Sequence, residues 1–456
     1  MKKTSLENWM SGKLFGLPGQ QLTQEGIHRY QLQKLKIVLD YVSRRSPFYR
    51  KHLRGISSRD LRDIDDISVL PMTSSKDLQH NGPQFLCVSQ SEVERIVTLQ
   101  SLHKDEPPKR IYFSADDLEL TIDFFYHGMK TLVHPGQRVL ILMPGERTAG
   151  VGDLLAKALV RAGVEAFIHG IVKDPVRTIH DIVEKEIDCL VGIPTQVLSL
   201  ARHEKADEIP AGRISSILLS TDYVPSSLVT ELQRVWACKV FGHYGTTDMG
   251  LGGGVECEAF DGYHLREADL LFEVVDPVTG QAVPDGHYGE IVFTTLTRDA
   301  MPLIRYRTGD LSKFLLEPCP CGTALRRLDK IKGKVHDSVS LRSGDCLSIS
   351  DLDETLFAVP GIINYTAFFT TSDSVDRLEL IIHPSNDDFQ PRLETVFGAI
   401  ARIPAISHAV KTGHLILEPI RFSTDNWITT GTEKRTILQR HSQDPNRQIF
   451  PTNSGS

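Results

Sequence analysis

Four cysteine and histidine residues in the second half of the chain carry the side chains that zinc prefers. Cys257 and His264 flank a turn, CEAFDGYH, and Cys319 and Cys321 form the knuckle Cys-Pro-Cys-Gly. Thiolates and an imidazole suit a tetrahedral Zn²⁺ ion, and four protein ligands leave no open position for catalysis. We therefore expect a structural Cys₃His zinc site. The alternative is a set of free buried thiols, because the spacing is not that of a standard zinc ribbon.

A second group of polar side chains lies in residues 241–248, FGHYGTTD, which follow a predicted strand. The ring of Tyr244 can stack on adenine, and Gly245 lets the backbone approach a ligand closely. Hydroxyl and carboxylate groups next to them can hold phosphate or a bridging Mg²⁺ ion. These residue types suit a nucleotide site, and the candidate residues are Tyr244, Gly245, Thr246, Thr247 and Asp248.

The longer segment Gly289–Asp310, GEIVFTTLTRDAMPLIRYRTGD, is more specific. It resembles the signature of phenylacetate–CoA ligases, and FGHYGTTD resembles the Tyr-Gly-x-Thr-Glu motif of adenylate-forming ligases, with Asp248 where the family usually has Glu. The resemblance covers nearly the whole chain. It implies that Asp310 accepts hydrogen bonds from both ribose hydroxyls, for which a carboxylate has two oxygens. The alternative is an ordinary Gly-Asp turn between strands.

The same resemblance implies roles for other residues. Arg327, in RRLDKIKG, corresponds to a nucleotide-binding position of the family, and Asp329 corresponds to its hinge. The alternative is a solvated basic linker, which would have the same charge pattern. Lys434, in GTEKR, corresponds to the lysine that steadies the transition-state charge, although a lone lysine is usually exposed. Thr221 and Asp222 follow a strand where family members contact adenine. The implied catalytic residues are Lys434, Thr247 and Asp248.

One segment departs from the family pattern. Family members carry a loop of the form Ser-Ser-Gly-Thr-Thr-Gly-x-Pro-Lys, whose amides wrap the β- and γ-phosphates of ATP. The corresponding residues 100–113, QSLHKDEPPKRIYF, contain no glycine. Asp105 and Glu106 would repel a polyphosphate, and two consecutive prolines remove N–H donors. Positive charge in this segment that could offset them comes from His103, Lys104 and Lys109.

Three functions are compatible with these features. The first is an acyl- or aryl-CoA ligase that uses ATP, with Mg²⁺, to make an acyl-AMP from a carboxylic acid and transfers the acyl group to the thiol of CoA or a carrier protein. The family association suggests an aromatic acid. The second is an ATP-independent acyltransferase from acyl-CoA to an acyl carrier protein. The third is a catalytically silent binding homologue.

The elements that must position these residues read as an α/β protein. Short apolar runs ending in Pro, His or Ser alternate with helical stretches from about residue 117 to 245, which favours a mostly parallel sheet whose ligands bind beyond the carboxyl ends of the strands. The resemblance implies the adenylate-forming fold, with a large multi-sheet N-terminal domain and a small mobile α+β lid. We expect residues 1–326 (including a β-rich lobe at about 252–325), a hinge at 327–335 and the lid at 336–456.

The amino-acid composition and net charge limit the classes of binding partner. Hydrophobic residues make up 40% of the 456 residues and charged residues 24%, as in ordinary globular proteins, and the net charge of −7 argues against nucleic acid or an anionic membrane as the main partner. No apolar run approaches the roughly 20 residues that span a bilayer, and the N-terminus lacks the features of a signal peptide. We expect a cytoplasmic protein.

Overall fold

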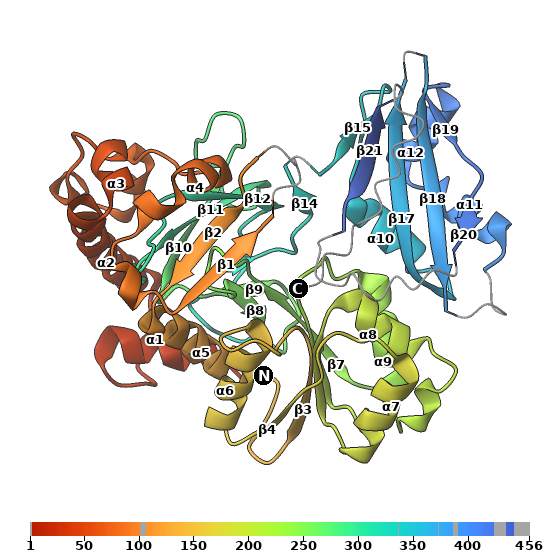
Figure 1. The fold of residues 1–456 in the computed structure, drawn as a ribbon, viewed down its shortest axis with the longest axis horizontal. Helices are drawn as coiled ribbons and strands as arrows, with labels where there is room; N and C mark the ends of the chain where they lie inside the picture. The colour runs from red at the N-terminus through yellow and green to blue at the C-terminus, as the bar shows by residue number, and fades with distance from the viewer. Residues whose placement is uncertain are drawn as a thin grey trace. The chain divides into compact units, whose positions relative to one another are not determined.

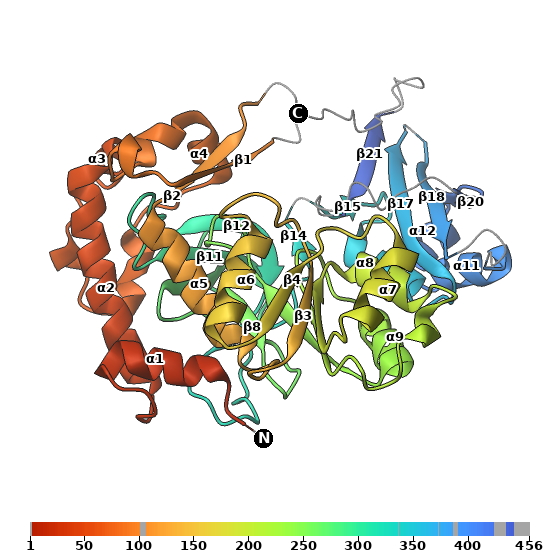
Figure 2. The same ribbon diagram turned by 60° about the horizontal axis from the view of Figure 1, so that its bottom comes forward.

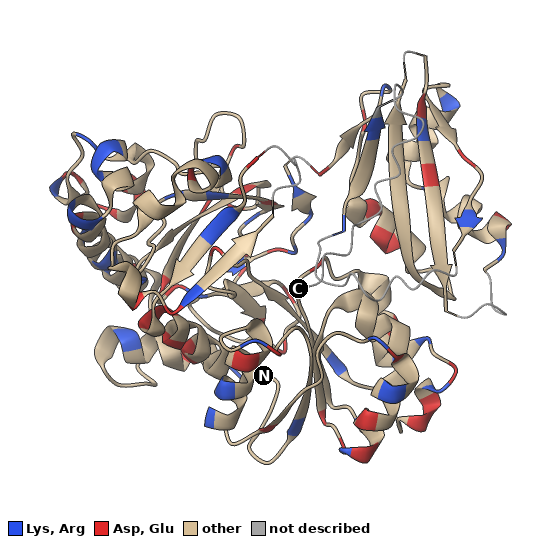
Figure 3. Cartoon of the chain, in the orientation of Figure 1, with Lys and Arg blue, Asp and Glu red and all other residues tan. Residues whose placement is uncertain are grey.

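The computed structural model describes residues 2–100, 106–335, 337–372, 374–385, 391–423 and 435–441. The chain divides into two compact units. The first comprises residues 1–224 and 229–335, and the second comprises residues 225–228 and 336–456. Figure 1 shows the elements of both units in chain order. Acidic and basic residues are interspersed along these elements (Figure 3).

An eight-stranded sheet forms the centre of the first unit, in the order β13-β9-β8-β7-β6-β5-β3-β4. Its five parallel strands run from β7 to β4, and β8, β9 and β13 continue the sheet in antiparallel pairing. Strands β5 and β6 are buried at every residue, as expected for a sheet covered on both faces. The strands are β3 (Arg138–Leu142), β4 (Glu165–Ile168), β5 (Cys189–Gly192), β6 (Ser216–Leu219), β7 (Lys239–Tyr244), β8 (Gly254–Glu256), β9 (Tyr263–Leu265) and β13 (Arg327–Leu328).

Helices cover the two faces of this sheet. The chain moves outward from β3 to β4 and then returns to β5, β6 and β7, so right-handed crossovers place α6 on one face and the following helices on the other. Figure 2 shows α5 and α6 on one side of β3 and β4, and α7, α8 and α9 on the other. The helices are α5 (Ala115–Met129), α6 (Val151–Arg161), α7 (Pro175–Glu184), α8 (Pro194–Ala201) and α9 (Ser226–Trp236).

A second sheet of the first unit carries the longer sequence motif. It has the order β10-β11-β12-β14, with all neighbours antiparallel. A two-stranded hairpin, β1-β2, and four N-terminal helices complete the unit. These elements are α1 (Ser5–Phe15), α2 (Gln24–Arg45), α3 (Pro47–His52), α4 (Ser75–Asn81), β1 (Arg95–Leu99), β2 (Lys109–Phe113), β10 (Leu270–Val275), β11 (Gly289–Thr295), β12 (Tyr306–Ser312) and β14 (Gly333–Lys334).

The second unit is a smaller α+β structure. Strands β17 and β18 form its antiparallel centre, β19 and β20 pair with β18, and β21 pairs with β17. Strands β15 and β16 form a separate pair. The elements are α10 (Ile349–Leu356), α11 (Leu393–Ile400), α12 (Pro404–Lys411), β15 (Val339–Ser340), β16 (Cys346–Leu347), β17 (Ile362–Thr371), β18 (Asp376–Pro384), β19 (Leu415–Leu417), β20 (Arg421–Phe422) and β21 (Ile437–His441).

The structure confirms the α/β reading. The Thr-Gly-Asp segment at 308–310, for which an ordinary turn between strands was the alternative, lies inside β12. The basic run at 326–334, for which a solvated linker was the alternative, contributes β13 to one sheet and β14 to the other. The residues for which a structure is given include no helix long and apolar enough to cross a membrane.

Candidate functional site

The loop after β7 carries the shorter motif. Strand β7 ends at Tyr244, and Gly245 begins a tight turn. A Cβ atom at Gly245 would lie 2.7 Å from the carbonyl oxygen of Leu251 and 2.9 Å from the Cα of Gly252, so only glycine fits this close approach. The amides of Met249 and Leu251 donate to the carbonyl of Thr246 and close the turn. The loop therefore projects from the carboxyl end of a central parallel strand, where α/β proteins bind ligands.

A bulge in β12 places Asp310. Glu290 of β11 pairs with Leu311 of β12, and Val292 of β11 pairs with Arg307 of β12. The single residue between Glu290 and Val292 therefore lies opposite three residues of β12, at positions 308–310. Such a bulge redirects the side chains of the longer segment. Asp310 is 1% exposed, and its backbone N–H donates to the side chain of Thr308. The bulge accounts for a Gly-Asp pair within a strand.

A hydrogen bond joins the two motifs. The hydroxyl of Tyr244 donates to Oδ2 of Asp310 at 2.9 Å, across 66 residues of sequence. Lys334 Nζ lies 3.8 Å from the other carboxylate oxygen. Burial, and after it the Asp310 charge, raises the pKa of Tyr244 well above its usual value, so this hydroxyl remains a donor at neutral pH.

An ion pair links Asp248 to the start of β2. Lys109 Nζ lies 3.0 Å from Oδ1 and 3.1 Å from Oδ2 of Asp248, and 3.2 Å from the hydroxyl of Tyr306. The lysine and aspartate side chains are 15% and 9% exposed. From the sequence, Lys109 is named only as a positive charge in the phosphate segment, and Tyr306 is not included among the site residues. Tyr306 could have been identified from its position within the longer motif, residues 289–310.

The strand neighbouring β7 contributes further polar groups at the same sheet edge. Thr221, directly after Ser220, has φ +84°, a strained conformation for a β-branched residue and one that often marks functional sites. The Ser220 hydroxyl lies 2.8 Å from Nδ1 of His243. Burial lowers the pKa of His243 to about 4, so the imidazole is neutral at pH 7. Asp222 accepts a hydrogen bond from the amide of Tyr223.

Other expected residues are placed as follows. Thr246 Oγ1 is buried and has no hydrogen-bond partner within the described part of the chain, and Thr247 accepts from the amide of Gly250 through its carbonyl. Arg327, 3% exposed, binds Asp261 and the carbonyl of Glu317. Asp329 accepts from the hydroxyl of Tyr288 at 2.8 Å. The nucleotide and hinge roles of these residues stay predictions.

Lys434 lies outside the described residues, and the residue after it is firmly held. Arg435 forms an ion pair with Asp353, which is 1% exposed. The Arg435 guanidinium also lies over two aromatic rings, 4.8 Å from the centre of Phe357 and 4.5 Å from that of Tyr365. The Tyr365 hydroxyl donates to the same carboxylate. These contacts fix the start of the segment that leads into β21.

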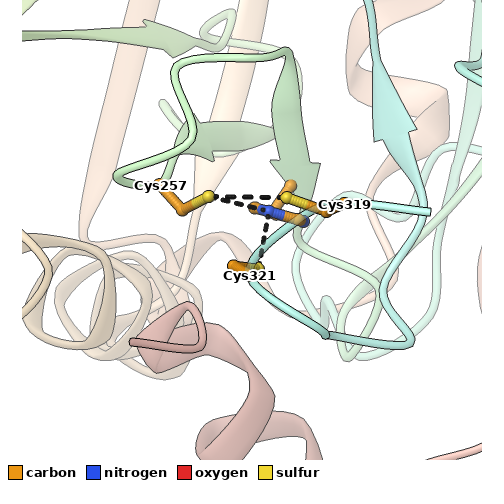
Figure 4. A group of neighbouring side chains, drawn as sticks. Cys257, Cys319 and Cys321 are labelled. Carbon is orange, nitrogen blue, oxygen red and sulfur yellow. Dashed lines mark hydrogen bonds between the residues drawn. The ribbon is translucent and has the colours of Figure 1, made fainter. Parts of the chain in front are cut away.

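The four predicted metal ligands lie together. Their ligand atoms all lie within 4.8 Å of one another, and all four residues are buried. Cys257 Sγ is 3.6 Å from Cys319 Sγ and 3.3 Å from His264 Nε2, and Cys321 Sγ is 3.6 Å from the same nitrogen. In Figure 4 Cys257 comes from one loop, Cys319 and Cys321 come from a second, and the three side chains face one another. The group is separate from the Asp248 and Asp310 contacts in its residues and its bonds.

Known proteins support the reading of these motifs. The AMP-binding enzyme family matches residues 108–296. The phenylacetate-coenzyme A ligase of Thermus thermophilus is 28% identical over 385 residues, covering 81% of this chain and 84% of that enzyme. The enzyme of the same name from Pseudomonas putida is 27% identical over 336 residues, covering 71% and 74%. These similarities to the AMP-binding enzyme family and to phenylacetate-coenzyme A ligases support placing the chain in the adenylate-forming superfamily.

Solved structures agree on the fold of this ligase-like chain. The structure of 2-hydroxyisobutyryl-CoA ligase in complex with R3-HIB-AMP has a TM-score of 0.77 at 21% identity, and the match covers 92% of this chain and 90% of that one. An anthranilate CoA ligase in complex with anthranoyl-AMP has a TM-score of 0.52 at 15% identity, covering 75% and 66%. The chain is thus an acid–thiol ligase-like enzyme with the adenylate-forming fold.

Proposed function

We propose that this enzyme activates a carboxylic acid, aromatic in class, as an acyl-AMP and transfers the acyl group to the thiol of CoA or of an acyl carrier protein. The observation that carries the proposal is the bond between Tyr244 and Asp310, because it brings the two nucleotide motifs together. Asp310 would hold the ribose diol, and Thr221, Asp222 and Tyr244 would border the adenine.

The chemistry needs charge stabilisation at the carboxylate and at the α-phosphate. Asp248, with the hydroxyl of Thr247 beside it, would hold Mg²⁺ on the phosphates of ATP, as a hard oxygen ligand suits that ion. Lys434 would stabilise the negative charge that develops when the acid oxygen attacks the α-phosphorus and pyrophosphate leaves. The relatives named phenylacetate-coenzyme A ligase support both the acid class and the use of CoA.

A second candidate is ATP-independent acyl transfer from acyl-CoA to a carrier protein. It is favoured by the absence of glycine in residues 100–113, because that segment then lacks the glycine amides that wrap the β- and γ-phosphates in family members. A thiol-to-thiol transfer needs no triphosphate. A catalytically silent binding homologue would keep the Tyr244–Asp310 and Lys109–Asp248 contacts and catalyse neither reaction.

Pyrophosphate exchange distinguishes the three functions. The purified chain is incubated with ATP, Mg²⁺, labelled pyrophosphate and a panel of aryl and fatty acids, with the Asp310→Ala variant as a control. Acid-dependent exchange that the variant loses supports the ligase. Transfer from acyl-CoA to a carrier without exchange supports the acyltransferase. If neither reaction occurs but AMP or CoA still binds, the result supports the catalytically silent binding homologue.

We also propose a structural zinc ion at Cys257, His264, Cys319 and Cys321. Zn–S distances of about 2.3 Å and Zn–N distances of about 2.0–2.1 Å around a tetrahedral ion place neighbouring ligand atoms roughly 3.5–3.8 Å apart. Three of the separations, 3.3–3.6 Å, come close to that arrangement, and all four ligand atoms lie within 4.8 Å of one another. The 3.6 Å between two sulfurs is far longer than a disulfide bond. One zinc per chain by elemental analysis is the expected result.

A further inference from the structure

A buried arginine behind the Asp248 loop is not used by the proposed chemistry. Arg298 lies in the longer motif, after β11, and is 6% exposed. Its Nη1 donates to the carbonyl of Asp248 at 2.7 Å, and its Nη2 donates to the carbonyl of Tyr112 at 3.0 Å. The guanidinium lies 4.4 Å from the centre of the Phe113 ring. One rigid planar group therefore bonds two segments that lie far apart in the sequence.

These two segments carry the two halves of the site ion pair. Tyr112 lies on β2, the strand that begins with Lys109, and the other bonded carbonyl belongs to Asp248 itself. Arg298 thus holds the backbone of both sides of the Lys109–Asp248 pair at once. A lysine in place of Arg298 has a single nitrogen and cannot span two carbonyls with a planar pair of donors.

Arg298 is itself held from a third direction. Its Nε lies 3.9 Å from Oδ2 of Asp117, near the start of α5. The Asp117 carboxylate also accepts from the amides of Asp299 and Ala300, the two residues that follow Arg298. A cavity of about 20 Å³, the size of one water molecule, is bordered by Asp117, Arg298 and Gly250. Burial lowers the pKa of Arg298, with Asp117 and Asp248 opposing that shift.

We propose that Arg298 is a positioning residue that sets the geometry of Asp248 against Lys109. It acts through the backbone and does not touch the substrate. The inference rests on the proposed function for its kinetic consequence, because Asp248 is the expected phosphate-side carboxylate. It also has a consequence for stability that is independent of any reaction.

Arg266 provides a matched control. It is 3% exposed and pairs with Asp269 at 2.7 Å, and it donates to the carbonyl of Leu120. It borders the same cavity as Arg298, but its hydrogen bonds within the described part of the chain reach neither Asp248 nor Tyr112. Arg266→Lys therefore imposes a similar change in a similar buried environment without altering either bond to the ion-pair segments.

The kinetic test is a double-mutant cycle in acid-dependent pyrophosphate exchange. Arg298→Lys is expected to lower kcat by roughly 100-fold, the loss that a displacement of about 1 Å can cause. In an Asp248→Asn background the same substitution is expected to change kcat by less than about threefold, because the group it positions is already lost. Arg266→Lys should give the same factor in both backgrounds. Equal factors for Arg298→Lys in both backgrounds would overturn the proposal.

The second test does not depend on catalysis. Urea unfolding of the wild type, Lys109→Met, Arg298→Lys and the double variant measures the coupling between the two sites. We expect Lys109→Met to be clearly less destabilising in the Arg298→Lys background, whereas strict additivity would overturn the inference. If Arg298→Lys does not fold, Arg298→Gln takes its place in both cycles. Absent exchange in the wild type would refute the proposed ligase activity, and the unfolding cycle would still decide the role of Arg298.

Discussion

Replacing Asp310 with asparagine tests the proposed nucleotide site with almost no change in shape. The carboxylate is 1% exposed and accepts the hydroxyl of Tyr244 at 2.9 Å. In the asparagine variant one oxygen becomes an amide nitrogen, which donates and cannot accept. The hydroxyl of Tyr244 can still donate to the remaining oxygen, but the ribose diol loses one acceptor and the charge on the other.

The size of the effect follows from the bonds involved. Hydrogen bonds to a charged group contribute about 1.5–3 kcal/mol, against about 0.5–1.5 kcal/mol for neutral pairs. Losing one charged bond and weakening another should cost about 2–4 kcal/mol of AMP binding, which corresponds to a roughly 30- to 700-fold higher Kd. The fold should change in stability by only about 1 kcal/mol, because Tyr244 keeps a partner.

Alanine at the same position separates binding from stability. Asp310→Ala leaves the buried hydroxyl of Tyr244 without its acceptor, which should lower the free energy of unfolding by a further ~1–3 kcal/mol. Calorimetric titration with AMP and urea unfolding would be measured on both variants, with the exposed Asp285→Asn as a control expected to match the wild type. A folded Asp310→Asn variant that binds AMP with wild-type affinity would refute the assignment of this carboxylate to the ribose.

Three further predictions concern other parts of the molecule. Chelation of the proposed zinc, or Cys319→Ser, should lower the thermal midpoint and remove the metal from elemental analysis, whereas Cys238→Ser should retain it. Burial lowers the pKa of His243 to about 4, so the unfolded chain takes up a proton on this histidine at a higher pH than the folded chain does. The free energy of unfolding should therefore fall as pH drops from about 6.5 towards 4, by up to about 3 kcal/mol. In unfolding measured at pH 5 and pH 7.5, His243→Asn should lose less stability at the lower pH than the wild type does. Asp353→Ala removes the carboxylate that pairs with the partly buried Arg435 and should destabilise the second unit by about 3–5 kcal/mol in urea unfolding, and an unchanged transition would contradict this.

The parallel sheet was predictable because its signal is local. Arg138–Pro144 and Cys189–Pro194 are short apolar runs of the length of buried strands, and β3 and β5 occupy most of them. The same local reading failed at 308–310. Thr-Gly-Asp is a common turn sequence, and only pairing with β11 on one side and β14 on the other keeps it inside a strand.

The candidate site was only partly predictable, for a related reason. Asp248 and Asp310 belong to motifs whose residue types indicate a nucleotide, so the sequence alone names them as candidates. Lys109 and Arg298 act on Asp248 across 139 and 50 residues of sequence, and their contacts depend on how β2 and the segment after β11 approach the loop. Cys257, His264, Cys319 and Cys321 were grouped from the sequence, and the structure brings these four residues together. The grouping was possible because few Cys and His residues occur between positions 257 and 321.

The pairing of Lys109 bears directly on the altered phosphate segment. At 3.0 Å and an effective dielectric constant of about 20, the attraction between Lys109 and Asp248 is on the order of 5 kcal/mol before the cost of desolvating the charges is counted. Under the proposed ligase activity, a triphosphate that recruits Lys109 would give up this attraction, and an Mg²⁺ ion held by Asp248 would replace the ammonium. These two changes would favour each other, because the ion would satisfy the carboxylate while the lysine met the phosphates. The proposed activity therefore predicts that Mg²⁺–ATP binds more favourably than ATP alone, and ATP titrations with and without Mg²⁺ would check this.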